Sequence, residues 1–214
     1  MICSLNCFCD FLEAKTPEGQ AAVVRRYKRN TTEASKGMMI YYSPALRLIR
    51  GKLCPNGSLD EKLAALRGAC IIASWTDKLN DARIASNTRV FKAFRSVFGN
   101  RKLKILSSPR MQYLASTDVA VNLQPELYVE VDGALMMWKF GMCKDTRPDR
   151  VIGIILQVME KAARHKGLAL SLEQMGYLDT VTGKTYIERT PNPKLESELE
   201  PSVSSLVRVW ERAA

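Results

Sequence analysis

The residues best placed to do chemistry are one acid and one lysine on a predicted β-hairpin. Asp132-Gly133 is a strong two-residue turn signal, and β-rich sequence flanks it on both sides. A two-residue loop fixes the strand register, so Glu126 should lie opposite Lys139 with Cβ atoms about 5 Å apart. A carboxylate there can ligate a hard cation such as Mg²⁺. The same two side chains can instead form a plain cross-strand ion pair worth about 0.2–1 kcal/mol.

The first hundred residues, which must support this hairpin, are expected to be helical. Ser43-Pro44 is typical of a helix N-cap followed by a first-turn proline, and residues 30–37 are expected to form a loop. Ser58 and Glu61 have the spacing of a capping box. Helices are therefore predicted over residues 5–14, 17–28, 45–53, 59–71 and 77–98.

The second half of the chain changes to strand periodicity around the hairpin. Strands are predicted over residues 102–107, 113–122, 124–131, 134–142, 168–178 and 184–188, and helices over 147–165 and 194–214, the last interrupted near Pro201. This order predicts an α/β fold, a mixed sheet with one crossover flanked by helices and preceded by an all-helical N-terminal part. The parts are residues 1–101 and 102–214. They are expected to form one compact unit, because no linker composition occurs near residue 100.

Composition and charge narrow the class of protein. The chain of 214 residues is 46% hydrophobic and 25% charged, which is ordinary for a globular protein with a core. No apolar run reaches the ~18 residues of a membrane span, and the N-terminus lacks a basic segment and carries Asp10, unlike a signal peptide. A cytoplasmic protein without membrane contact is expected.

The excess of basic residues points to polyanion partners. The formal net charge is +10, which favours DNA or RNA through steering and counterion release, although a solvated basic surface is the alternative. Residues 47–52 are one of several basic stretches. The predicted nucleic-acid contacts are Arg25, Arg26, Lys28, Arg29, Arg101, Lys102 and Lys104.

Six cysteines call for a separate interpretation. Without a secretory signal, disulfides are not expected. The spacing of Cys3, Cys7 and Cys9 matches no zinc pattern. On a helix, Cys3 and Cys7 would share a face with Phe11 as small core residues.

The hairpin and the helix and strand after it resemble the PD-(D/E)XK nuclease-like superfamily over roughly residues 103–190. In that family an acid begins the second strand, an acid-x-Lys sits on the third, and the next helix often carries Gln or Tyr facing the site. Pro125-Glu126, Lys139 and Gln157 match these positions, although Gln157 could also be a solvated polar residue. The resemblance implies a phosphodiesterase site in which Glu126 helps to hold Mg²⁺ and Lys139 activates water or neutralises charge.

One residue departs from the family pattern. Met137 stands two residues before Lys139, where the pattern has an acid, and a thioether cannot replace a carboxylate as a Mg²⁺ ligand. Glu126 alone would hold a metal poorly. The expected protein therefore has a degenerate site and no cofactor, and binds nucleic acid or scaffolds an assembly on it.

Two alternatives remain open at this stage. One is a protein-interaction or structural module with no nucleic-acid role. The other is an active metal-dependent nuclease that uses Mg²⁺ and an atypical third acid, supplied by Asp118, Glu130 or Glu13.

Overall fold

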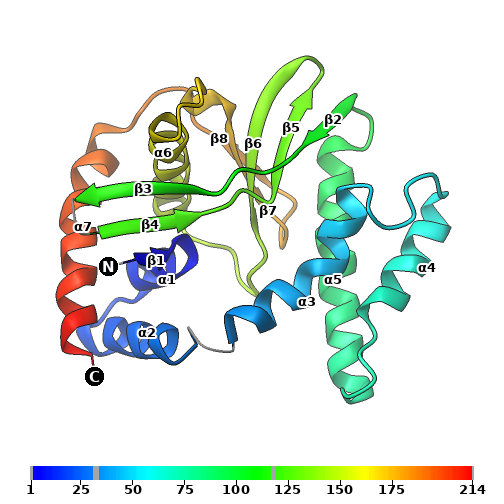
Figure 1. Cartoon of the computed structure of the whole chain (residues 1–214), viewed down its shortest axis with the longest axis horizontal. Helices are drawn as coiled ribbons and strands as arrows, with labels where there is room; N and C mark the ends of the chain where they lie inside the picture. The colour runs from blue at the N-terminus through cyan, green and yellow to red at the C-terminus, as the bar shows by residue number, and fades with distance from the viewer. Residues whose placement is uncertain (1, 31–33, 117–118, 214) are drawn as a thin grey trace.

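A five-stranded mixed sheet lies between two groups of helices (Figure 1). The computed structural model describes residues 2–30, 34–116 and 119–213. In spatial order the strands are β2 (Leu103–Leu106), β5 (Leu127–Val131), β6 (Ala134–Gly141), β7 (Met175–Asp179) and β8 (Thr185–Ile187). Only β6 and β7 run parallel, joined by helix α6 (Asp149–His165). The predicted α/β class with one crossover is confirmed.

The hairpin forms in the predicted register. Tyr128 lies opposite Met137, and Glu130 lies opposite Leu135. Asp132 and Gly133 both have positive φ, 52° and 91°, as a two-residue turn of type I′ requires. The turn chemistry is therefore enough to fix which residues of β5 and β6 share a face.

A smaller sheet has three strands and takes up the chain's N-terminus. Its order is β1 (Ile2–Ser4), β4 (Val119–Leu123) and β3 (Met111–Ser116), with β1 parallel to β4. Cys3 pairs with Val121. Strand β1 corrects the prediction of an all-helical N-terminal part, although that part is mostly helical. Its pairing partner lies far along the sequence, where local periodicity gives no signal.

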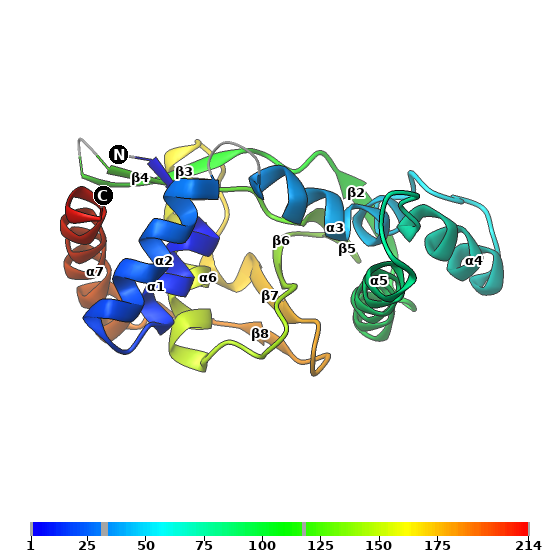
Figure 2. The same cartoon turned by 90° about the horizontal axis from the view of Figure 1, so that it is seen from below.

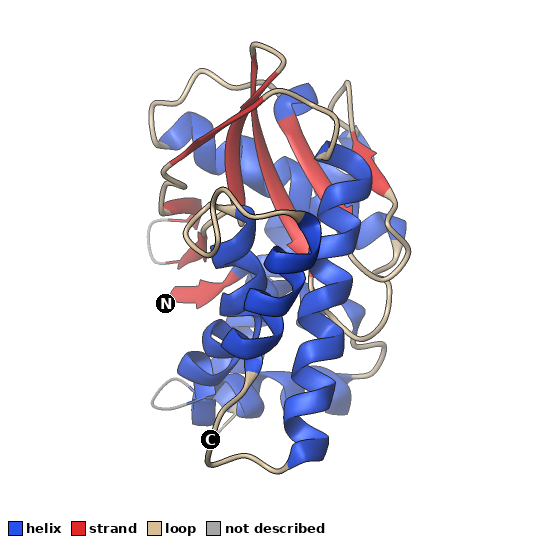
Figure 3. Ribbon diagram, turned by 90° about the vertical axis from the view of Figure 1, so that its right-hand side faces the viewer, coloured by secondary structure: helices blue, strands red, loops and turns tan. Residues whose placement is uncertain are grey.

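The helices form two layers, one on each face of the large sheet (Figures 1 and 2). The first layer is α1 (Leu5–Glu13), α2 (Pro17–Asn30), α6 and α7 (Pro193–Arg212). The second is α3 (Ala34–Ile49), α4 (Leu59–Cys70) and α5 (Asp77–Phe98). Figure 3, turned so that the side carrying α4 and α5 faces the viewer, shows the twisted strands and these helices together.

Side chains of β6 point alternately to the two faces of the large sheet and so enter the hydrophobic core on each face. Met137 is buried against the first layer, whereas Trp138 and Phe140 are buried against the second, because neighbouring strand residues point to opposite faces. Residues 2–30 pack with the second half of the chain, and residues 34–98 form the opposite layer.

Helix α3 differs from its prediction, because Pro44 lies inside the helix and does not begin it. Of the predicted loop 30–37, residues 34–37 are helical, and residues 31–33 lie outside the described part. Proline breaks the helical hydrogen-bond ladder, and Asn87 of α5 repairs it. The Asn87 side chain accepts from Ala45 N–H at 2.9 Å and donates to the Tyr41 carbonyl at 2.8 Å.

The other helix boundaries follow the sequence signals with one exception. Ser58 and Glu61 form the predicted capping box at α4. Helix α7 continues through Pro201, contrary to the predicted interruption; Pro201 and Ser197 are exposed, so water can reach the freed carbonyl. Only the end of the predicted strand 168–178 pairs as β7, after a 3₁₀ turn over Leu172–Gln174. Among the described residues, no helix has both the length and the apolar character to cross a bilayer.

Candidate functional site

The predicted contact between Glu126 and Lys139 is present and almost completely buried. Lys139 Nζ lies 2.5 Å from Glu126 Oε1, and the backbone N–H of Phe140 donates to Oε2 at 2.8 Å. The side chains of Lys139 and Glu126 are 10% and 9% exposed. Both carboxylate oxygens are therefore engaged by the protein itself.

Two elements fix the backbone around Glu126. Glu126 lies in the short connection between β4 and β5, whereas Lys139 lies on β6. The Arg50 guanidinium, just beyond the end of α3, donates to the Glu126 carbonyl from Nε at 3.2 Å and from Nη2 at 2.6 Å. Arg50 thus ties the second helix layer to the hairpin.

This pair lies at the bottom of a cavity of about 450 Å³ between α3 and the strands. The buried lining includes Glu126, Lys139, Phe140, Gly141, Arg147 and Tyr177. The exposed residues around the opening are Ser4, Arg47, Lys52, Asn122 and Gln124. The cavity therefore has a buried floor and a polar, cationic rim.

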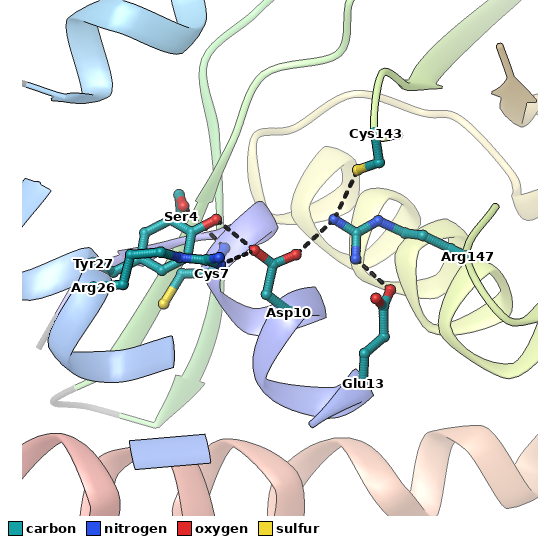
Figure 4. A network of polar contacts seen from close by, with 8 residues as sticks. All are labelled: Ser4, Cys7, Asp10, Glu13, Arg26, Tyr27, Cys143 and Arg147. Atoms are coloured by element: carbon teal, nitrogen blue, oxygen red, sulfur yellow. Dashed lines mark hydrogen bonds and ion pairs between the residues drawn. The ribbon is translucent and has the colours of Figure 1, made fainter. Parts of the chain in front are cut away.

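A buried arginine connects the cavity to the N-terminal helix (Figure 4). Arg147 donates from Nη2 to Asp10 Oδ1 at 2.8 Å and from Nη1 to Glu13, and its side chain is only 5% exposed. Nη2 also lies 3.4 Å from Cys143 Sγ. Asp10 in turn accepts from Arg26 and Tyr27 of α2. The sequence did not predict this network, because its partners lie far apart in the chain.

Burial sets the protonation of the groups near Arg147. Burial alone would lower the pKa of Arg147, but the negative charges that Cys9 and Cys143 acquire at high pH, together with Asp10, more than offset this and raise it, so the guanidinium stays charged. Burial raises the pKa of Cys9 to about 12, and it also raises the pKa of Cys143 despite the opposing charge of Arg147. At neutral pH both remain thiols, which are poor nucleophiles.

Two residues of the predicted site are placed elsewhere. Gln157 is 2% exposed, and its Nε2 lies 3.5 Å from the Asn192 carbonyl at the start of α7. Ile155, not Gln157, is the α6 residue in the cavity lining; two positions apart on a helix differ by about 200°, so they face opposite sides. Met137 is fully buried in the first core and outside the cavity lining.

The acids near the site are already committed to cations of the protein. Glu13 and Asp10 hold Arg147, Glu130 lies 3.7 Å from Lys104, and Asp118 lies outside the described residues. Within residues 2–30, 34–116 and 119–213, no cluster of His, Cys, Asp or Glu has the arrangement of a metal site. The donor set around Glu126 therefore does not fit Mg²⁺, which needs several free oxygen ligands.

The predicted nucleic-acid residues do not come together. Arg25, Arg26, Lys28 and Arg29 lie on α2, while Arg101, Lys102 and Lys104 lie at β2, well apart from α2 in both views (Figures 1 and 2). Several bind neighbouring groups: Arg26 pairs with Asp10, Lys28 donates to the Ala213 carbonyl, and Arg101 lies near Asp132. Neither set lines the cavity.

The basic stretch that does reach the site is residues 47–52. Arg47, Arg50 and Lys52 all line the cavity. In the described part of the chain, none of these three side chains pairs with a carboxylate. Their placement depends on the course of the proline-containing helix α3, which the sequence did not predict.

No family model, curated protein or solved structure matches this chain. What the site can do therefore has to be argued from its own chemistry. Glu126 and Lys139 neutralise one another, and Arg147 is neutralised by the acids of α1, so the unbalanced charge belongs to Arg47, Arg50 and Lys52. Such a cavity favours an anionic ligand, since Arg and Lys side chains bind phosphate through charge-assisted hydrogen bonds.

Proposed function

We propose that this protein binds nucleic acid through the cavity beside Glu126 and Lys139, as a nuclease-superfamily-like protein with a degenerate metal site. The observation that carries the proposal is the cationic rim of Arg47 and Lys52 above the buried Glu126–Lys139 pair. Uncompensated cations at a concave site raise the local concentration of polyanions. Phosphate is the anion that nucleic acids present at every residue.

The position of the pair within the sheet also supports the resemblance. In chain order, β5 and β6 are the second and third strands of the large sheet. Glu126 directly precedes β5, Lys139 lies on β6, and α6 follows before the parallel strand β7. These are the places that the family gives to its acid, its lysine and its next helix.

Binding without cleavage is the activity that this donor set favours. Metal-dependent phosphodiester hydrolysis needs ligands that orient the ion and its water. Met137 is buried in the core, and both oxygens of Glu126 are engaged. An active nuclease would need a third acid, and Glu13 and Glu130 are each paired with a basic side chain.

A salt series on paired variants tests the proposal. We expect the wild-type chain to bind a labelled oligonucleotide at low salt, measured by fluorescence anisotropy, with log K falling steeply as salt rises. Arg47→Ala/Lys52→Ala should weaken binding about tenfold and reduce the salt slope by roughly 1.4–1.8, since each phosphate contact contributes about 0.7–0.9.

The matched control removes the same charge elsewhere. Arg101→Ala/Lys104→Ala lowers the net charge equally at β2, outside the cavity, and should change affinity much less. Absence of binding at low salt, or an equal loss in both double variants, would reject the cavity as the binding site. Cleavage with Mg²⁺ or Mn²⁺ that Glu126→Gln abolishes would replace this proposal with the nuclease alternative.

A further inference from the structure

We infer that the cavity holds one unpaired nucleotide unit, with its phosphate at Arg47 and Lys52 and its base inside, so that single strands bind in preference to duplexes. This inference rests on the proposed function. The ligand is a single phosphorylated nucleotide unit, either free or at the unpaired end of a strand.

The size of the cavity sets the first limit. Its volume is about 450 Å³, within the range of about 300–1,000 Å³ that is typical of sites for small molecules. Such a space can enclose one nucleotide. A duplex presents its phosphates on the outside and keeps its bases stacked and paired, so it cannot place a base in the cavity without unpairing it.

The distribution of charge decides the orientation of the ligand. At the floor, Lys139 and the Phe140 N–H occupy the Glu126 carboxylate, and Arg50, which has no carboxylate partner among the described residues, uses its Nε and Nη2 donors on the Glu126 carbonyl. At the rim, Arg47 and Lys52 are exposed and lack carboxylate partners among the described residues. A phosphate is therefore best bound at the rim, which directs the rest of the nucleotide inward.

The walls below the rim suit a base. Tyr42 and Leu46 of α3 line one side, and Leu5, Ile155 and Tyr177 line other parts of the cavity. Tyr42 is half-buried, and an aromatic side chain offers a face for stacking on any base. The walls between the cationic rim and the charged floor are thus partly apolar and aromatic, which suits the base of a nucleotide whose phosphate lies at the rim.

Two amides at the opening offer hydrogen-bonding groups to the ligand. Asn122 Oδ1 accepts from Gln112 at 2.9 Å, and Gln124 Nε2 donates to the Ser108 carbonyl at 3.1 Å. These contacts leave the Asn122 amide hydrogens and the Gln124 carbonyl oxygen for a ligand. A donor and an acceptor at the opening can hydrogen-bond the sugar and phosphate of a nucleotide whose base lies deeper in the cavity.

Binding by three probes tests the inference on the intact chain. The probes are a labelled 12-nucleotide oligothymidylate, a labelled 12-base-pair duplex, and dTMP as an unlabelled competitor. We expect the single strand to bind at least about tenfold more tightly than the duplex. If dTMP competes with the single strand, the free nucleotide is a sufficient ligand. If dTMP does not compete although the single strand binds tightly, the ligand is the end of a strand. Either result supports an unpaired unit.

Adjacent tyrosines provide the matched variants. Tyr42→Leu should weaken single-strand binding about tenfold through lost stacking, whereas Tyr41→Leu, outside the cavity lining, should leave it unchanged. Circular dichroism checks that both variants fold, and the wild-type probe comparison does not depend on either of them.

Two results would separate the inference from the proposed function. Equal or tighter binding of the duplex, still weakened by Arg47→Ala/Lys52→Ala, would overturn the inference and leave the proposed function standing. A folded Tyr42→Leu variant with unchanged affinity would also overturn it, because the base would then lie elsewhere. If no probe binds at low salt, both the inference and the proposed function are rejected.

Discussion

At the scale of residues, the Glu126–Lys139 pair combines a contact of 2.5 Å with nearly complete burial. A buried ion pair loses much of its Coulomb energy to desolvation, so it is weak as a device for stability alone. Here the pair also accepts the Phe140 N–H and lies under a cationic rim. Stability alone therefore does not account for a buried charge pair at this place beside the cavity.

A double-mutant cycle measures what this pair contributes. Lys139→Met leaves the Glu126 carboxylate buried with one backbone donor, and should lower the free energy of unfolding by about 3–5 kcal/mol in urea titrations. Glu126→Gln/Lys139→Met removes both charges and should recover much of that loss. A double variant as unstable as Lys139→Met would contradict this account.

At the scale of elements, helix α3 is held in its course by a residue from another helix. The Asn87 side chain spans the gap that Pro44 opens between the Tyr41 carbonyl and the Ala45 N–H, and Asn87 is fully buried. Because α3 carries Arg47 and leads to Arg50 and Lys52, this repair also places the cationic rim.

Removing the repair should destabilise the protein in a way that depends on Pro44. Asn87→Ala leaves the buried Ala45 N–H unpaired, which should cost about 1–3 kcal/mol in the free energy of unfolding. Pro44→Ala should rescue part of this loss, because the straightened helix can form its own bond from Ala45 to Tyr41. If chemical denaturation shows that the changes in the free energy of unfolding from Asn87→Ala and Pro44→Ala simply add, then Asn87 does not stabilise the protein by repairing the break at Pro44.

An element could be predicted from the sequence when the residues that fix it lie close to it along the chain. The hairpin register could be predicted because Asp132-Gly133 acts within a few residues. The course of α3 could not, because Asn87 lies 42 residues after Ala45. The place of Arg147 depends on Asp10, 137 residues earlier. Gln157 was assigned to the site by resemblance, but the period of α6 turns it toward α7.

At the scale of the whole molecule, the cavity lies where the two helix layers meet. Leu5 and Ile155 line it from the first layer, and Tyr42 and Leu46 line it from the second. Asp179, which is 1% exposed, lies opposite Gly141 and helps to fix the carboxyl ends of β6 and β7. It accepts from Thr146 Oγ1 at 2.8 Å, Thr182 Oγ1 at 2.7 Å and the Val181 N–H at 2.8 Å.

The hydrogen bonds of Asp179 should make the fold sensitive to acid. Burial raises the pKa of Asp179, but its hydrogen bonds outweigh this and lower it below the ordinary 3.8. A folded-state pKa below the unfolded one contributes stability above about pH 4 that is lost as pH falls through the lower folded value. Asp179→Asn should therefore lower the free energy of unfolding by about 1–3 kcal/mol at pH 7. In urea titrations, the difference from wild type should narrow below about pH 4.

The exposed Asp145→Asn serves as the control for this acid dependence. Its free energy of unfolding should follow the wild-type curve at every pH. A gap between Asp179→Asn and wild type that stays constant down to pH 3 would show that the carboxylate charge is not what stabilises the turn.

The parallel pairing of β1 with β4 has a consequence for the order of events during synthesis. Ile2 pairs with Ala120, so β1 has no partner until β4 has been made, more than a hundred residues later. At about 5–20 residues per second, that interval is roughly 6–24 seconds. During it the thiols of Cys3, Cys7 and Cys9, which the finished fold buries, have no core to enter. The helices α3–α5, by contrast, can meet one another as soon as they emerge. Strand β1 thus leaves the ribosome long before the strand that fixes its place.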